Sequence, residues 1–268
     1  MITPKPKCGY ANAAFGQVHF RELGDGAPLV LLHQAPMDSR QFDSVYEPLA
    51  RRGFRAIGID MPGFGNSDVH PGAPSVENYV DCVLPVLDAL GLKQVALLGH
   101  HTGALVATEA AVRWPERFSK LIINGPLPIN AEERQEWLEK GHVWELGLVP
   151  RDGGGHFNEI FERREALACG TIPASMISHY VVQAFSGEAP FWHGHFAAYT
   201  YDHAASLPRV AIPALIFTKT GDVIYDLALR AHAIRPDFAF RALEGGGVDI
   251  VDQQSEAWAD VVRDYLTN

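Results

Sequence analysis

Short apolar runs alternate with helical stretches along much of this chain, and this alternation restricts the fold more than any other feature. Six runs have the length and apolar content of buried strands, at residues 29–32, 54–59, 95–98, 121–123, 214–217 and 238–243. Residues 76–90 and 103–113 have helical patterns, and Pro85 is expected to kink or shorten the first helix. Strands joined by helical crossovers are typical of a parallel sheet. The sequence therefore predicts an α/β fold class with a mostly parallel central sheet flanked by helices.

The alternation stops between residues 131 and 207. This segment contains helical and irregular stretches that are rich in aromatic residues and histidines, and it contains no clear strand pattern. We expect it to be an insertion in an otherwise continuous domain. The predicted core domain then comprises residues 1–130 and 208–268.

The charge and composition of the chain limit its partners. The formal net charge is −10 at pH 7, which repels nucleic-acid phosphates and anionic lipid headgroups. We therefore expect no nucleic-acid partner and no binding to a membrane. No apolar run is long enough to span a bilayer and no signal-peptide pattern opens the sequence, so a cytoplasmic location is the default expectation. Cys8, Cys82 and Cys169 match no redox or metal-binding spacing and are expected to be free thiols.

A strand-to-helix turn contains the most unusual residue of the sequence. Residues 96–104 read ALLGHHTGA, in which an apolar strand runs into a helix through a tight turn. Gly-x-Ser-x-Gly at such a turn is the nucleophile elbow of serine hydrolases, and here His101 stands at the serine position.

Three further segments join this turn. HQAP at residues 33–36 is similar to a His-Gly-x-Pro turn, and DMPGFGNS at residues 60–67 is similar to a D-x-P-G-x-G-x-S loop. Asp222 follows the apolar run at 214–217. In this order and spacing, the chain resembles the α/β-hydrolase superfamily over nearly its whole length.

The resemblance implies an α/β-hydrolase fold with a helical cap, formed by residues 131–207, over the carboxyl ends of the strands. It also implies an oxyanion hole built from the backbone N–H groups of Ala35 and Thr102, and a catalytic acid at Asp222. A small-molecule substrate is implied, with no cofactor and no metal. His193, His195 and His203 suggest a metal site, but they match no recognised ligand spacing.

Two residues depart from the family pattern. His101 replaces the serine, and Val248, in the sequence GGGVD at residues 245–249, stands where the family has its general-base histidine. The only histidine after His203 is His232, which precedes the last predicted strand. A serine needs a base beside it to attack a carbonyl group, so an acyl-serine intermediate at position 101 is excluded.

An imidazole at the turn can take over part of the missing chemistry. We expect His101 to extend into the space beside Val248 and to meet Asp222, which gives a base and an orienting acid without a serine. Such a dyad suits hydrolysis by an activated water molecule, which is the leading hypothesis. Non-hydrolytic acid–base chemistry, as in a lyase, isomerase or decarboxylase, is a close alternative. Two further alternatives are direct attack by the imidazole on the substrate and a non-catalytic protein that binds a small molecule.

Five residues are predicted to form the oxyanion hole or to contact the substrate, namely Gln34, Ala35, His100, Thr102 and Trp192. Gln34 replaces the family's glycine and offers a side-chain amide. His100 is at the variable position of the motif, where a packed neighbour is the simpler interpretation. Trp192 belongs to an aromatic group that either lines a pocket or forms the core of the insertion, and that includes Phe191, Phe196 and Tyr199.

Three other polar residues have simpler roles in this interpretation. His33 is expected to hold loop backbone by hydrogen bonds. Asp249 and Asp252 follow Val248 closely and are alternative acids, for which solvated or helix-capping roles are favoured.

Overall fold

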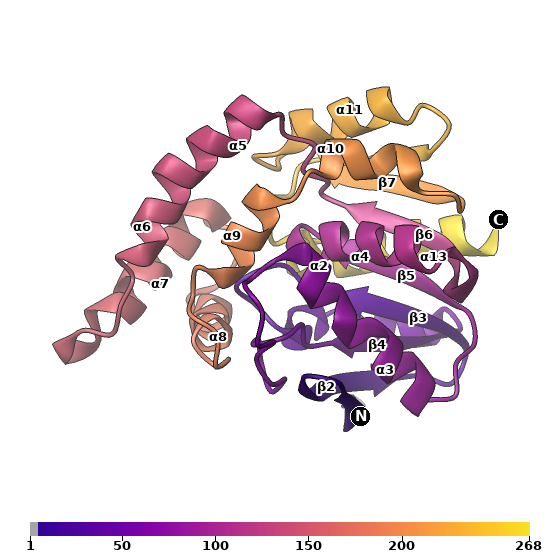
Figure 1. The fold of residues 1–268 in the computed structure, drawn as a ribbon, viewed down its shortest axis with the longest axis horizontal. Coiled ribbons are helices and arrows are strands. Elements are labelled where there is room, and N and C mark those ends of the chain that lie inside the picture. Colours follow the sequence, from indigo (N-terminus) through magenta and orange to yellow (C-terminus); the bar gives the residue numbers. More distant parts are fainter. Residues whose placement is uncertain (1–4) are drawn as a thin grey trace.

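One sheet of eight strands forms the centre of the molecule. The computed structural model describes residues 5–268, and the strands lie in the order β1-β2-β4-β3-β5-β6-β7-β8 (Figure 1). Their bounds are β1 (Lys7–Ala13), β2 (Gly16–Leu23), β3 (Ala27–Leu32), β4 (Phe54–Ile59), β5 (Val95–His100), β6 (Phe118–Asn124), β7 (Ala214–Lys219) and β8 (Ala239–Leu243). Strands β3 to β8 pair in parallel, and β1–β2 and β2–β4 are antiparallel. The predicted fold class is confirmed, and each of the six predicted runs coincides with a strand or lies within one, except that β8 begins one residue after the predicted run at 238–243.

The sequence patterns do not reveal the first two strands. Strands β1 and β2 form an antiparallel hairpin at one edge of the sheet, and β2 joins the hairpin to β4. Most residues of β1 are exposed or half-buried. A half-exposed edge hairpin needs no continuous apolar run, so it lacks the pattern that identifies the buried parallel strands.

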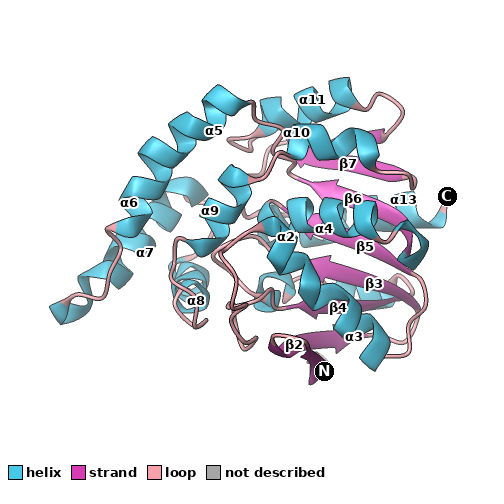
Figure 2. Ribbon diagram, in the orientation of Figure 1, coloured by secondary structure: helices cyan, strands magenta, loops and turns pink. Residues whose placement is uncertain are grey.

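Helices cover both faces of the sheet (Figure 2). The core helices are η1 (Ser39–Phe42), α1 (Tyr46–Arg51), α2 (Val76–Tyr79), η2 (Val80–Cys82), α3 (Val83–Ala89), α4 (Thr102–Arg113), η3 (Pro115–Arg117), α11 (Tyr225–Ile234), α12 (Ile250–Gln253) and α13 (Ser255–Thr267). The helix predicted at 76–90 is divided into α2, η2 and α3. Pro85 lies in the first turn of α3, where the N–H that proline lacks would have no acceptor within the helix. No helix within residues 5–268 has the length and apolar character needed to cross a bilayer.

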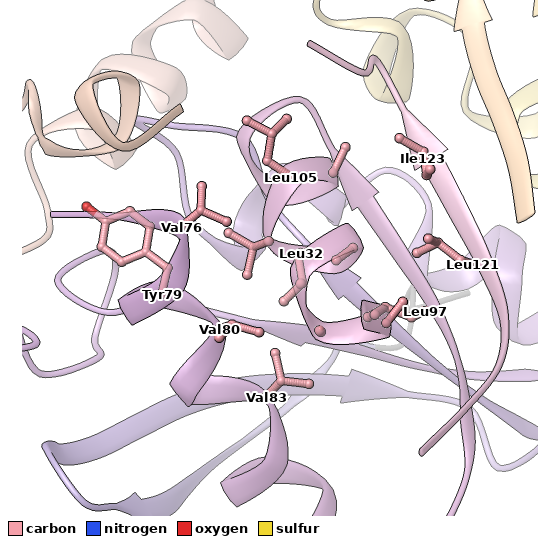
Figure 3. Close-up of a cluster of buried hydrophobic side chains, with 14 of the residues drawn as sticks. Leu32, Val76, Tyr79, Val80, Val83, Leu97, Leu105, Leu121 and Ile123 are labelled. Carbon is pink, nitrogen blue, oxygen red and sulfur yellow. The ribbon is translucent and has the colours of Figure 1, made fainter. Parts of the chain in front are cut away.

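Apolar side chains fill both faces of the sheet. In β3, Val30 belongs to the cluster on one face and Leu31 to the cluster on the other, because successive strand residues point to opposite sides. Figure 3 shows part of the first cluster, with Leu97 of β5 and Leu105 of α4 among its members. On the opposite face, Trp258 of α13 is fully buried. Burial on both sides explains why these strands are continuous apolar runs.

The segment 131–207 contains helices and, within these fully described residues, no strand, as the sequence predicts. Its elements are α5 (Ala131–Trp137), the π-helix η4 (Leu138–His142), α6 (Val143–Leu146), η5 (Asp152–Gly154), α7 (Gly155–Ala168), α8 (Ala174–Ala184), α9 (His193–Thr200), α10 (His203–Ser206) and the start of η6 (Leu207–Arg209). In Figure 2, α5 to α9 lie beside the end of the sheet where the parallel strands finish. The division into a core and a cap at these boundaries stays a prediction.

Candidate active site

The turn between β5 and α4 holds His101 in a constrained backbone conformation, with φ 49° and ψ −113°. Few residues with side chains adopt a positive φ, so the surroundings must stabilise this turn. The chain packs very closely here. A Cβ on Gly99 would lie 2.0 Å from the carbonyl oxygen of Gly103, and a Cβ on Gly103 would lie 2.1 Å from that of Leu32. Backbone packing therefore requires both glycines of the motif, whatever side chain stands at residue 101.

The ring of His101 contacts Asp222, which lies three residues beyond the end of β7. Nε2 of His101 is 2.9 Å from Oδ2 of Asp222. Gly125, just after β6, makes room for the ring, because a Cβ there would lie 2.5 Å from Cδ2 of His101. The structure thus brings together the two residues of the predicted dyad, whose catalytic role stays a prediction.

A buried lysine joins this pair. Lys219 is the last residue of β7, and its side chain is fully buried. Its Nζ lies 2.6 Å from Oδ2 of Asp222, 3.0 Å from Nε2 of His101 and 3.2 Å from Nε2 of His100. The sequence signal for this residue is a charged side chain at the end of the buried strand ALIFTK. The predicted set of site residues does not include it.

Burial and neighbouring charges set the ionisation of these groups. Burial lowers the pKa of His101, and the Asp222 carboxylate opposes that shift. Burial likewise lowers the pKa of Lys219 against the pull of Asp222. For Asp222 itself burial favours the neutral acid, but His101 and Lys219 outweigh burial and hold the pKa of this carboxyl well below its usual range. Near neutral pH, the site therefore contains a neutral imidazole beside an ionised carboxylate.

The other edge of His101 borders a cavity of about 380 Å³. Within residues 5–268, Nδ1 of His101 has no hydrogen-bond partner. This atom is not fully buried by the protein. This nitrogen therefore faces the cavity. Val248 also lines this cavity.

Three of the five predicted binding residues, Gln34, Ala35 and Thr102, line the cavity. Within the described part of the chain, the backbone N–H groups of Ala35 and Thr102 donate to no protein acceptor. The side-chain amide of Gln34 donates to Sδ of Met37 at 3.1 Å. Two residues of the cavity lining, Ala35 and Thr102, thus carry backbone N–H groups without a protein acceptor.

The other two predicted binding residues, His100 and Trp192, are not among the residues that line the cavity, and their contact with a substrate stays a prediction. His100 is fully buried behind the turn, where its ring contacts Gln41 and Lys219. Trp192 packs against the rings of His142 and Phe196. Alternation along β5 explains the place of His100, because its side chain lies on the same face of the sheet as that of Leu98, two residues earlier.

His33 holds the loop that carries Gln34 and Ala35, as predicted. Its Nδ1 donates to the carbonyl oxygen of Gln34 at 2.9 Å, and its Nε2 accepts the backbone N–H of Met61 at 2.9 Å. Burial lowers the pKa of His33, which keeps the ring neutral, as one donor and one acceptor require.

Aromatic side chains and two polar pairs form much of the cavity wall. The aromatic residues are Trp137, Trp144, Tyr180, Phe191 and Tyr199. Of the predicted aromatic group, Phe191 and Tyr199 line the cavity, whereas Phe196 does not. Arg164, which pairs with Asp249, and His195, which pairs with Glu145, also border it.

The roles expected for Asp249 and Asp252 are corrected. Asp249 is buried and pairs with Arg164, instead of being solvated or capping a helix through its side chain. Asp252 accepts the hydroxyl of Tyr180 at 2.5 Å and that of Ser44. Both carboxylates therefore support the wall of the cavity.

The histidines that suggested a metal site make other contacts. His195 pairs with Glu145, and Nδ1 of His203 accepts the backbone N–H of Leu127 at 3.1 Å. Within residues 5–268, no group of three or more His, Cys, Asp or Glu side chains is placed to hold a metal ion.

Residues 27–166 match the family model described as the alpha/beta hydrolase fold. The chain belongs to the α/β-hydrolase family. Among solved structures of this fold, a bromoperoxidase from Bacillus anthracis has a TM-score of 0.84 at 18% identity, covering 98% of this chain and 100% of that one. An esterase from Thermogutta terrifontis has a TM-score of 0.78 at 22% identity, covering 97% and 98%.

Curated members of the family align with part of the chain. It is 29% identical over 132 residues to an (E)-2-((N-methylformamido)methylene)succinate hydrolase of Acinetobacter baylyi, covering 47% of this chain and 50% of that relative. It is 32% identical over 114 residues to a 2-hydroxy-6-oxo-6-phenylhexa-2,4-dienoate hydrolase of Comamonas testosteroni, covering 41% and 40%. The chain thus spans about half the length, or less, of these curated relatives.

Proposed function

We propose that this protein is a cofactor-free enzyme that hydrolyses a small carbonyl compound with a water molecule activated by His101. The observation that carries the proposal is the orientation of the imidazole. One ring nitrogen contacts Asp222 and the other faces the cavity. A base held by a carboxylate on its far side is the arrangement that general-base catalysis requires.

In the proposed reaction, Nδ1 of His101 takes a proton from water while the water oxygen bonds to the carbonyl carbon. Asp222 stabilises the imidazolium that forms. The backbone N–H groups of Ala35 and Thr102 donate to the oxyanion, and the positive end of the α4 dipole adds to their effect. When the bond to the leaving group breaks, His101 returns its proton to that group. Because His101 replaces the serine, and Val248 the family's histidine, no acyl-serine intermediate forms.

The cavity supports a small, partly apolar substrate. Its volume of about 380 Å³ and its aromatic walls are typical of sites for small organic molecules. The guanidinium of Arg163, which also borders the cavity, lies 3.5 Å from the ring centroid of Trp144 and provides a positive charge. Two relatives are named as hydrolases of a succinate derivative and of a dienoate, both of which carry carboxylates. We therefore propose that the substrate carries a carboxylate group.

The proposal is tested with a panel of activated esters, lactones and β-dicarbonyl compounds, each offered with and without a carboxylate group. For a compound that is turned over, the reaction is run in ¹⁸O-labelled water and the intact protein is followed by mass spectrometry. We expect one label in the acid product and no covalent adduct on the protein. A stable acyl adduct on His101 would instead identify the imidazole as the nucleophile.

The two remaining hypotheses give different results in the same experiment. A lyase, isomerase or decarboxylase forms its product without oxygen from water, and exchanges substrate hydrogen with solvent when a proton is removed from carbon. A binding protein shifts the melting temperature with a bound compound and turns none over. Either result would replace hydrolysis as the function of this site.

The pH dependence of kcat/KM is expected to have an acid limb with a midpoint below 6.5, the ordinary pKa of histidine. Burial lowers the pKa of His101, and only the unprotonated ring acts as a base. Activity is therefore present above this lowered pKa and is lost as the pH falls through it. A midpoint above 6.5 in the measured profile would contradict the proposed base.

A further inference from the structure

A second histidine in the cavity wall also has a carboxylate behind it. His195 of α9 borders the cavity, and its Nδ1 contacts Oε1 of Glu145. Glu145 is buried, and its other oxygen, Oε2, has no hydrogen-bond partner within residues 5–268. Among the described residues, His195 is thus the only side chain that pairs with Glu145. An ionised carboxyl group accepts hydrogen bonds and donates none, so Nδ1 of His195 carries the proton of this contact.

Two contacts hold the ring of His195 in one orientation. Glu145 holds Nδ1, and the ring stacks on that of Tyr199, with centroids 5.8 Å apart and planes inclined by 8°. Nε2 of His195 has no hydrogen-bond partner within residues 5–268, and this atom is not fully buried. It is therefore the polar atom that the ring presents to the cavity. A side chain that is already held in place loses little conformational freedom when it binds a ligand.

Helix α9 places this ring beside the predicted oxyanion loop. Gly194 directly precedes His195, and a Cβ on Gly194 would lie 2.2 Å from Cβ of Ala35. The start of α9 therefore packs against the loop that carries the backbone N–H of Ala35. Burial is the main cause of the lowered pKa of His101, and a positive charge on His195 would lower it further. The two imidazoles thus lie within electrostatic reach of each other, at the same cavity.

Stability alone does not account for the pair of His195 and Glu145. Moving a carboxylate out of water is costly, and a buried charged pair contributes little net stability compared with apolar side chains of similar size. The unpartnered Oε2 of Glu145 adds to this cost. A few polar groups that converge on a largely apolar pocket are, in contrast, the usual means of orienting a small ligand.

We propose that His195 is a further substrate-binding residue, and that its Nε2 accepts a hydrogen bond from a hydroxyl or N–H group of the substrate. Glu145 is a positioning residue that acts through His195. Because Glu145 holds the proton on Nδ1, a ring with a single proton has its lone pair on Nε2. The substrate is then a carbonyl compound that carries a hydrogen-bond donor in addition to its carboxylate. This role in binding substrate rests on the proposed function, whereas the state of the ring does not.

The charges around the cavity are consistent with an uncharged His195. Arg163 and Arg164 border the same cavity, so a second proton on His195 would add a third positive charge to its wall. Arg164 is already paired with Asp249. Arg163 then remains for the carboxylate of the substrate, and Nε2 of His195 for its donor group. The two polar ends of the substrate thus have different partners.

The state of the ring is tested by two-bond ¹H–¹⁵N NMR of the histidine-labelled protein near neutral pH, which requires no turnover. The spectrum separates rings with Nδ1–H, rings with Nε2–H and imidazolium rings. We expect His195 to carry only Nδ1–H, with its signals assigned by their loss in His195→Phe. An Nε2–H ring or an imidazolium ring at this position would overturn the proposal.

Binding is tested by calorimetry with three probes, namely benzoate, 3-hydroxybenzoate and 4-hydroxybenzoate. We expect at least one hydroxybenzoate to bind about two- to tenfold more tightly than benzoate, because a neutral hydrogen bond contributes about this factor. In His195→Phe, an aromatic ring remains beside Tyr199 but the acceptor is lost, so the ratio of the affinities should fall to about one. His195→Gln supplies an amide oxygen and should restore part of the preference. Equal affinity of all three probes, including no binding by any, would contradict the proposal.

Two further variants exclude a loss of folding as the cause. His195→Phe leaves Glu145 buried without its partner, so the double variant His195→Phe/Glu145→Leu replaces the whole pair with apolar residues and should give the same ratio of about one. His193→Phe changes a histidine of α9 that does not line the cavity, and should keep the preference of the unmodified protein. A preference that persists in the double variant would refute the role of His195.

The proposed hydrolysis and the role of His195 fail independently. The affinities and the NMR signals require no turnover, so failure of hydrolysis by His101 would leave them unchanged. Hydrolysis together with equal affinities for the three probes would refute the role of His195 alone.

Discussion

Replacing His101 with alanine is expected to lower kcat/KM by about 10²- to 10⁴-fold on whichever substrate the protein hydrolyses, because a positioned general base contributes about this factor. The backbone donors at Ala35 and Thr102 and the cavity remain, so the residual rate reflects binding and oxyanion stabilisation. The measurement is steady-state kinetics at a pH above the acid limb. The reduction should appear mainly in kcat, since the base acts in the transition state.

The matched control is His193→Ala. His193 is a half-buried histidine of α9 that does not line the cavity. We expect its rate to stay within about twofold of the unmodified protein, and both variants to retain cooperative thermal unfolding. An equal rate in His101→Ala would remove the imidazole from the mechanism.

The second large effect concerns stability. Gly103→Ala is expected to destabilise the protein by about 3 kcal/mol or more, which corresponds to a fall in Tm of roughly 6 °C or more. The added Cβ would lie 2.1 Å from the carbonyl oxygen of Leu32 and 2.6 Å from that of His33. Both are backbone atoms at the buried carboxyl end of β3, a central strand, and neither has a rotamer through which to move away. The whole turn must shift.

Gly155→Ala in α7 is the control for helix propensity. At this position the nearest atom to an added Cβ is Nε of Arg151, 3.9 Å away at the end of a flexible side chain. Alanine is the better helix former by up to about 1 kcal/mol, so this variant should be neutral or slightly stabilised. If Gly103→Ala has the same melting temperature as the unmodified protein, the close approach of residue 103 to the backbone of Leu32 and His33 does not contribute to stability.

The strands that helices cover on both faces of the sheet are the part of this fold that the sequence predicts best. The strands at 54–59 and 95–98 are apolar because helices cover both faces, and the surrounding turn residues mark their ends. The hairpin of β1 and β2 has one exposed side and few such constraints, so its sequence contains no comparable signal. Residues 131–207 contain no strand pattern, so the absence of strands from this segment is predictable. The bounds of its individual helices are not predictable from the sequence.

The candidate site also contains some residues that the sequence predicts and others that it does not. The His101–Asp222 contact is predictable because both residues follow strands at fixed points of a recognisable order. Lys219 and Gln41 are not, since their roles depend on which hydrogen-bond donor meets which acceptor in the folded protein. The aromatic composition around Trp192 does not indicate which side of a helical segment faces the cavity, and in the structure Phe191 and Tyr199 line the cavity whereas Trp192 does not.

The backbone conformation at residue 101 also bears on which amino-acid substitutions this turn can accept. The glycines at 99 and 103 hold the turn, and the N–H groups beside it belong to the main chain, so neither depends on the side chain between them. The backbone scaffold and the side chain at position 101 are therefore separable. A substitution at position 101 can exchange one side chain for another while the glycines and the main-chain N–H groups around it persist, so this position can vary without loss of the turn that carries it.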